Sequence, residues 1–144
     1  MDEVAALWRD LLAYHREIGE KDVRLATALS EGREFIKEHI GPKDRLCLVA
    51  ESDGTAVGFL VATLRRRSPT FGGWRYGHVY DAYVKGPFRR RGVGTKLVEE
   101  AFRWFRRHGV RRVQLQVRAR NVAGLRFWKD LKFDDLAKTL ERRV

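Results

Sequence analysis

The segment most able to do chemistry is a run of arginines and glycines that leads into a long amphipathic helix. Its sequence is Arg89-Arg90-Arg91-Gly92-Val93-Gly94-Thr95. Glycines let a backbone pass close to a ligand, and the first turn of a helix offers unpaired N–H groups to an anion. Adjacent arginines supply countercharge for more than one phosphate. The run lacks the ending of a P-loop and one glycine of the dinucleotide fingerprint, so a solvated basic turn is an equally good interpretation of these residues alone.

Hydrophobic periodicity predicts the elements that must position this run. Helices are expected at 4–18, at 22–39, from after Gly86-Pro87 to Gly109, and from Asn121 to 131. Strands are expected at 46–51, 56–64, 78–85, 111–118 and 133–144, with a turn at Asp53-Gly54 and a surface loop over 65–77. No repeat or linker interrupts this alternation, so residues 1–144 are predicted to form one α/β domain.

A second motif follows the first in an order typical of a known family. The strand Asp81–Val84 precedes Arg-x-x-Gly-x-Gly, and Asn-x-x-Gly-x-x-Phe-Trp begins at Asn121. Together the two motifs resemble the GNAT N-acetyltransferase superfamily, and the resemblance covers essentially the whole chain. It implies the GNAT acyl-CoA N-acyltransferase fold, an α/β (α+β) chain with a mixed, mostly antiparallel sheet flanked by helices. Members of the family usually begin with a strand before the first helix, and here that first strand is expected to be missing.

The resemblance also implies that acetyl-CoA is the co-substrate and that no metal takes part. Backbone amides from Arg90 to Thr95 would hold the pyrophosphate, while the strand before them would pair with the pantetheine arm. The thioester would lie where that strand and 111–118 separate, with the N–H of Val84 polarising its carbonyl. The residues assigned to acetyl-CoA are Ala82, Tyr83, Val84, Arg89, Arg90, Arg91, Gly92, Val93, Gly94, Thr95, Asn121, Gly124, Phe127 and Trp128. For Asn121, a plain helix cap is the alternative, and the two roles are compatible.

The expected acceptor is a primary amine that attacks directly in a ternary complex, and it must lose a proton. Some relatives carry a glutamate base at the position of Gln116, which cannot accept a proton. Asp81 is therefore the first candidate for the base, and Glu51 is the second. An Asp81 that only pairs with an arginine is the alternative, and we give it equal weight.

The departing thiolate must gain a proton. Trp128 stands where the family often has a tyrosine, and an indole N–H is not a usable acid. Trp128 is therefore expected to pack or to line the acetyl-CoA site, and water, Tyr80 or Tyr83 would supply the proton. Tyr80 shares a strand face with Val84 if no bulge intervenes.

Composition and charge argue against a metal-binding or membrane-spanning protein and indicate the charge of the partner. The single cysteine and four scattered histidines give no metal-binding spacing, and no apolar run is long enough to span a membrane. The expected location is cytoplasmic, with no membrane partner. The net charge is +11, and residues 61–144 hold 22 basic against 7 acidic side chains. Such asymmetry indicates an anionic partner for the second half of the chain.

Two other functions compete with an N-acetyltransferase. The first is a CoA-binding module that has lost catalysis, which the tryptophan at 128 and the glutamine at 116 keep open. The second is a basic nucleic-acid-binding domain, which is disfavoured because the arginines lie in loops and at one helix end, without a recognition helix. The acceptor itself is left open among small amines, amino acids, protein N-termini and lysines. The aromatic segment 71–76 is open to two interpretations, a lid over the acceptor or a contact in a homodimer.

Overall fold

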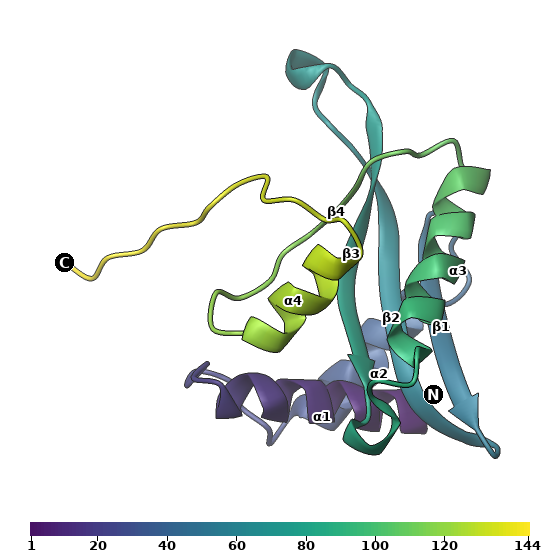
Figure 1. Ribbon diagram of the computed structural model, residues 1–144, viewed down its shortest axis with the longest axis vertical. Helices are drawn as coiled ribbons and strands as arrows, with labels where there is room; N and C mark the ends of the chain where they lie inside the picture. The colour runs from purple at the N-terminus through teal and green to yellow at the C-terminus, as the bar shows by residue number, and fades with distance from the viewer.

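A four-stranded sheet in the order β1-β2-β3-β4 organises the computed structural model, which describes residues 1–144 (Figure 1). The strands are β1 (Arg45–Ser52), β2 (Thr55–Arg66), β3 (Arg75–Val84) and β4 (Val113–Leu115). The first three are antiparallel neighbours, whereas β4 runs parallel to β3. A parallel pair needs a crossover connection, which helix α3 (Val93–Arg107) provides. The sheet is thus mixed and mostly antiparallel, as expected.

Helices cover both faces of the sheet (Figure 1). Helices α1 (Asp2–Glu17) and α2 (Ala28–Glu38) pack on one face, where Phe59 and Val61 of β2 are buried. Helices α3 and α4 (Val122–Asp130) lie on the other, where Leu60 and Ala62 are buried. Successive side chains of a strand point to opposite faces, so β2 must be apolar on both sides. None of the helices is both long and apolar enough to cross a lipid bilayer.

Several predicted boundaries are confirmed, and others differ from the prediction. The turn at Asp53-Gly54 joins β1 to β2, as predicted. Helix α2 begins at Ala28 rather than at residue 22, because the residue before the helix is Thr27, whose hydroxyl bonds Glu31. The predicted loop is confirmed for residues 67–74, which include a short 3-10 turn, η1 (Pro69–Phe71), whereas β2 extends to residue 66 and β3 starts at residue 75.

The strand predicted at 133–144 is wrong, since those residues form no regular element. Leu136 and Leu140 are exposed there, so their apolar side chains are not held by a core. A strand is stable only when a neighbouring strand accepts its backbone hydrogen bonds, and no strand lies beside this segment. Strand β4 is also shorter than predicted and ends at Leu115.

Candidate active site

A β-bulge in β3 marks the candidate active site. Val61 of β2 pairs with Asp81 and the next residue, Ala62, pairs with Val79, which leaves Tyr80 as the extra residue. The pairing of β3 with β4 stops at the same place, because its last pair is Val79 with Leu115. Beyond this point β3 continues to Val84 with β2 as its only neighbouring strand, so the two parallel strands β3 and β4 separate. We call this opening between β3 and β4 the fork, and it exposes one backbone edge of β3.

The free edge carries unpaired backbone groups from Val84. Lys85 donates its N–H to Val57 of β2, and residues in an antiparallel pair alternate between facing the partner and facing away. The N–H and C=O of Val84 therefore point into the fork. The C=O already accepts a hydrogen bond from Nε of Arg89 at 2.7 Å, and the N–H remains free for a ligand.

The bulge turns two consecutive side chains toward α1 and α2. Asp81 accepts a hydrogen bond from Nε1 of Trp8 at 3.2 Å, and the ring of Tyr80 lies 5.9 Å from that of Phe35. Val84 packs against the cluster on the α3 face instead. The expectation that Tyr80 shares a face with Val84 depended on a regular strand, and the bulge makes it wrong.

Asp81 is a largely buried carboxylate with one side-chain partner. Burial raises its pKa from 3.8 to about 6, against the opposing effect of the hydrogen bond from Trp8. No arginine pairs with it, so the alternative of a structural ion pair is not seen. A carboxylate with a pKa near 6 is ionised at neutral pH and still basic enough to take up a proton, which suits a general base.

Trp8 is held in place from α2. A Cβ on Gly32 would lie 2.8 Å from Cε3 of Trp8, so only glycine lets the indole lie flat against the helix. The ring of Phe35 stands 5.9 Å from the indole on the same side. Sequence reasoning missed Trp8 as a site residue, because an aromatic residue on the apolar side of a helix gives no sign of the strand carboxylate that it meets.

Tyr80 belongs to an aromatic cluster at the surface. Its hydroxyl accepts a hydrogen bond from Nη2 of Arg65 at 2.6 Å, and the ring of His78 lies 4.8 Å away. Burial and the charge of Arg65 lower the pKa of His78 to about 4, so this imidazole is neutral at pH 7. Burial also raises the pKa of Tyr83, which makes that phenol a poorer acid. The cluster therefore resembles a wall for an acceptor more than a set of proton donors.

The second candidate base does not reach the bulge. Glu51 is exposed near the β1–β2 turn and pairs with Ala56, with the whole width of β2 between it and β3. Gln116 follows the last residue of β4 directly, at the fork, where it is exposed. Asp81 is thus the carboxylate that the fold brings to the fork.

The arginine–glycine run forms the entry to α3, as predicted. Arg90 and Gly92 both adopt left-handed backbone conformations, with φ of 61° and 81°, which fold the loop sharply into the helix. Gly92 is the N-cap residue, and no side chain caps the first turn. A Cβ on Gly92 would meet nothing within 4 Å, so the first turn is open to a ligand. Its N–H groups can bind an anion.

Arg89 differs from its two neighbours in the run. Besides bonding Val84, its guanidinium lies 5.5 Å from the ring centre of Tyr14 and 5.2 Å from that of Tyr83. These contacts tie the loop to the end of β3 and to α1. Arg90 and Arg91 are exposed and pair with no carboxylate. They are the arginines left free to meet an anionic ligand.

The second motif meets the first across the fork. Oδ1 of Asn121 accepts hydrogen bonds from the N–H of Gly124 at 2.9 Å and from the hydroxyl of Tyr14 at 3.0 Å. Asn121 is thus the cap of α4 and also its link to α1, while Tyr14 is a site neighbour that no sequence motif marks. A Cβ on Gly94 would lie 3.1 Å from the ring of Phe127, so α3 and α4 touch where the two motifs meet.

Trp128 lies inside a packed aromatic group. Its ring centre is 4.9 Å from that of Phe127 and 5.2 Å from that of Phe133. These contacts give the indole a packing role, in line with the expectation that it is not an acid. No group of three or more His, Cys, Asp or Glu side chains gathers in a way that would hold a metal ion.

A forked mixed sheet beside a glycine-rich helix entry defines the acetyltransferase class of fold. A family model described as "Acetyltransferase (GNAT) family" matches residues 5–133, and the chain belongs to that family.

Curated and solved relatives agree with this assignment. An N-alpha-acetyltransferase of Sulfurisphaera tokodaii is 28% identical over 109 residues, which are 71% of this chain and 64% of the relative, so this chain spans less than two thirds of that protein. The BH1408 protein of Bacillus halodurans, solved as a tetramutant, has a TM-score of 0.89 at 20% identity, covering 99% of this chain and 92% of that one. The aminoglycoside N-acetyltransferase AAC(6')-Iy, solved in complex with CoA, has a TM-score of 0.69 at 22% identity, covering 97% and 88%.

Proposed function

We propose that this protein transfers the acetyl group of acetyl-CoA to a primary amine by direct attack in a ternary complex. The observation that carries the proposal is the fork beside the bulge, because it joins an open backbone edge, an uncapped helix N-terminus and a partly buried carboxylate. Membership of the GNAT family and the archaeal relatives named N-alpha-acetyltransferase support the same reaction.

The residues around the fork fit a CoA thioester. The N–H groups from Arg90 to Thr95 would bind the pyrophosphate, with the free guanidinium groups of Arg90 and Arg91 beside it. The exposed edge from Ala82 to Val84 would pair with the amides of the pantetheine arm. The fold neighbour solved with CoA supports this ligand class.

In the proposed reaction, bound acetyl-CoA supplies an activated acyl group, and this chain positions it and moves protons. The N–H of Val84 donates to the thioester oxygen and stabilises the negative charge that develops there. Asp81 accepts the proton of the attacking amine, directly or through one water, as the new C–N bond forms and the C–S bond breaks. Water protonates the thiolate, because Trp128 is packed and cannot ionise.

The acceptor would approach from the side of α1 and α2, where Asp81 and Tyr80 point. We therefore assign Tyr80, which is 39% exposed, to the wall of the acceptor site in place of the role of proton donor expected from the sequence. The relatives named N-alpha-acetyltransferase make a polypeptide α-amine the first acceptor class to test. Aminoglycosides are the second, since several fold neighbours are aminoglycoside acetyltransferases.

Calorimetry with acetyl-CoA, followed by mass spectrometry of an amine panel, tests the proposal. We expect saturable binding of acetyl-CoA and a mass gain of one acetyl group on at least one amine. The panel would contain peptides with different first residues, free amino acids and an aminoglycoside. Binding without any transfer would favour a CoA-binding module that has lost catalysis, and absence of binding would refute both functions.

A further inference from the structure

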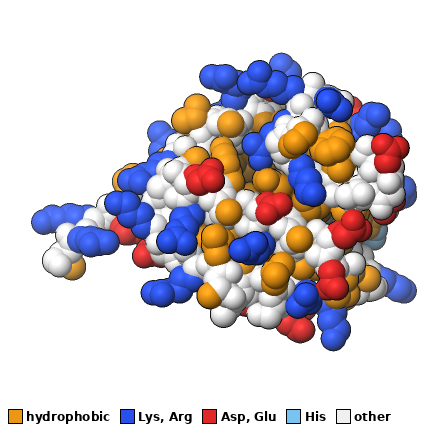
Figure 2. Space-filling model, turned by 90° about the horizontal axis from the view of Figure 1, so that it is seen from below, with side chains coloured by type: hydrophobic (Ala, Val, Ile, Leu, Met, Phe, Trp, Pro, Cys, Tyr) orange, Lys and Arg blue, Asp and Glu red, His pale blue; other side chains and the backbone are white.

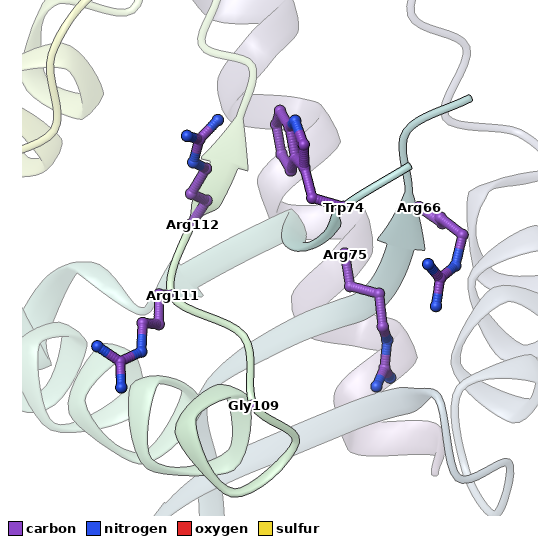
Figure 3. Close-up of a pocket in the computed structure, with 6 residues that line it drawn as sticks. All are labelled: Arg66, Trp74, Arg75, Gly109, Arg111 and Arg112. Atoms are coloured by element: carbon purple, nitrogen blue, oxygen red, sulfur yellow. The ribbon is translucent and has the colours of Figure 1, made fainter. Parts of the chain in front are cut away.

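A hollow lined by four arginines lies at the end of the sheet opposite the fork (Figure 3). Its volume is about 430 Å³, and its lining residues are Arg66, Trp74, Arg75, Gly109, Arg111 and Arg112. The strand β3 starts at this hollow and ends beside the glycine-rich loop. A ten-residue strand rises about 3.3 Å per residue, so about 30 Å separate the two places. The hollow is therefore remote from the glycine-rich loop, and it lies about 13 Å along β3 before Val79, where the fork begins.

Strand pairing brings these arginines together. Arg66 of β2 and Arg75 of β3 are direct cross-strand partners. In the parallel pair of β3 and β4, Gly77 is opposite Val113, which places residue 111 at the same level as residue 75. A backbone hydrogen bond of 2.8 Å from Gly77 to the C=O of Arg112 fixes this arrangement.

The charge gathered here has no acidic counterpart. The chain contains no Asp or Glu at 61–80 or at 101–129, and no salt bridge involves any of the four arginines. Like charges directly opposite each other on a sheet are destabilising. By contrast, Figure 2 shows Asp and Glu side chains interspersed with Lys and Arg when the molecule is viewed from below, at the end where β3 stops. The hollow thus gathers positive charge that no acidic side chain offsets.

Uncharged neighbours hold three of these side chains in place. The guanidinium of Arg112 lies 4.3 Å from the ring centre of Trp74. Arg66 donates to the C=O of Gly73 at 2.6 Å, and Arg75 donates to the C=O of His108 at 3.4 Å. Each guanidinium has five N–H donors, so every one of them keeps donors for a ligand. These contacts restrain three of the four side chains, which lowers the conformational entropy that they lose when a ligand binds.

We propose that this hollow binds the phosphodiester backbone of a nucleic acid. Arginine forks match phosphate oxygens, and here the guanidinium groups are spread around the hollow and point in different directions (Figure 3). Such a spread suits successive phosphates along a chain better than one phosphate group. This proposal departs from the expectation, drawn from the sequence, that nucleic acid is not a partner.

Fluorescence anisotropy with a labelled 20-nucleotide single-stranded RNA tests the proposal across a series of KCl concentrations. The variant Arg75→Gln/Arg111→Gln removes two charges from the hollow, and Arg142→Gln/Arg143→Gln removes two charges near the C-terminus as the matched control. We expect the first variant to lose at least tenfold in affinity and to reduce the slope of log K against log salt by about 1.4, since each contact to single-stranded nucleic acid contributes about 0.7. The control should change affinity less than threefold.

Three results would overturn the proposal. Wild-type protein that does not bind RNA at the lowest salt has no such site. Equal losses in the two variants would show attraction by net charge alone. Tighter binding to a labelled glutamate 20-mer than to RNA, with the same sensitivity to the hollow variant, would assign the hollow to an acidic protein instead.

Two further measurements separate this proposal from folding and from acetyl transfer. If circular dichroism shows the double variant to be unfolded, Arg111→Gln takes its place, because that side chain forms no hydrogen bond or ion pair within the chain. The single variant should lose at least threefold in affinity and about 0.7 in slope, and wild-type values would refute the site. Acetyl-CoA affinity should be unchanged in every variant, because none of the substituted arginines is among the residues assigned to acetyl-CoA.

Discussion

Replacing Asp81 by asparagine should slow acetyl transfer and at the same time stabilise the protein above pH 6. Asparagine keeps the shape of the side chain and an oxygen that can accept from Trp8, but it neither ionises nor takes up a proton. Burial raises the pKa of Asp81 from 3.8 to about 6, so the folded state binds this proton more tightly than the unfolded chain does. That stabilising contribution is complete below pH 3.8 and is lost as the pH rises through 6.

The size of the effect follows from the shift in pKa. A difference of about two pKa units amounts to about 3 kcal/mol, which the ionised carboxylate costs the folded state at pH 8. The asparagine variant escapes this cost. Its free energy of unfolding, measured with urea, should therefore exceed that of wild type at pH 8, and the advantage should disappear at pH 4. A variant no more stable than wild type at pH 8 would show that burial does not destabilise the ionised carboxylate.

The rate of acetyl transfer completes this test. General-base assistance accounts for about 10²–10⁴-fold in rate, so we expect a loss of that size in kcat at pH 8 with acetyl-CoA affinity retained. In wild type, kcat should fall about tenfold per pH unit below 6 as the base is protonated. Asp53→Asn is the matched control, because that residue lies in the β1–β2 turn with φ of 51°, which asparagine tolerates.

Superimposable pH profiles of equal maximal rate for wild type and Asp81→Asn would remove Asp81 from the mechanism. In that case the amine arrives already neutral, and the rate should climb toward the amine's own pKa in both proteins.

Three further substitutions test the other parts of the proposed site. Trp8→Phe removes the hydrogen bond that lowers the pKa of Asp81, so the acid limb of the kcat profile should move to higher pH, and an unmoved limb would show that Trp8 does not act through Asp81. Gly92→Glu should abolish calorimetric binding of acetyl-CoA in a chain still folded by circular dichroism, because its carboxylate would repel the pyrophosphate. Gly92→Ala, which shares the strain of a φ of 81° without the charge, is the control and should still bind. Trp128→Phe should retain considerable acetyl transfer. Trp128→Ala should reduce the free energy of unfolding by an amount near the lower end of about 3–5 kcal/mol, because the indole is only half-buried. Loss of turnover in a Phe variant with normal acetyl-CoA affinity would show a chemical role for the indole N–H.

Local sequence signals account for the elements whose residues lie close together in the chain. Asp53-Gly54 predicts its turn because both residues tolerate positive φ, and they adopt φ of 51° and 77°. The apolar stripe of α3 and the cap at Asn121 were predictable for the same reason, since a helix is made of contacts between residues three or four apart. The two glycine-containing motifs carry the family resemblance, and the matched family model confirms it.

Tertiary structure decided everything that depends on which strand lies beside which. The expected strand at 133–144 has no neighbour in the sheet, so its pattern alone could not make it form. The bulge at Tyr80 arises from the register of β2 against β3, and it reverses the face on which that side chain lies. Trp8 meets Asp81 across 73 residues of sequence, and the parallel pairing of β3 with β4 brings Arg75 and Arg111 to the same hollow. The sequence by itself determined the chemistry that each segment carries, and packing determined which segments share a site. The reason is that hydrogen bonds and charges act through space, whatever the separation of the residues along the chain.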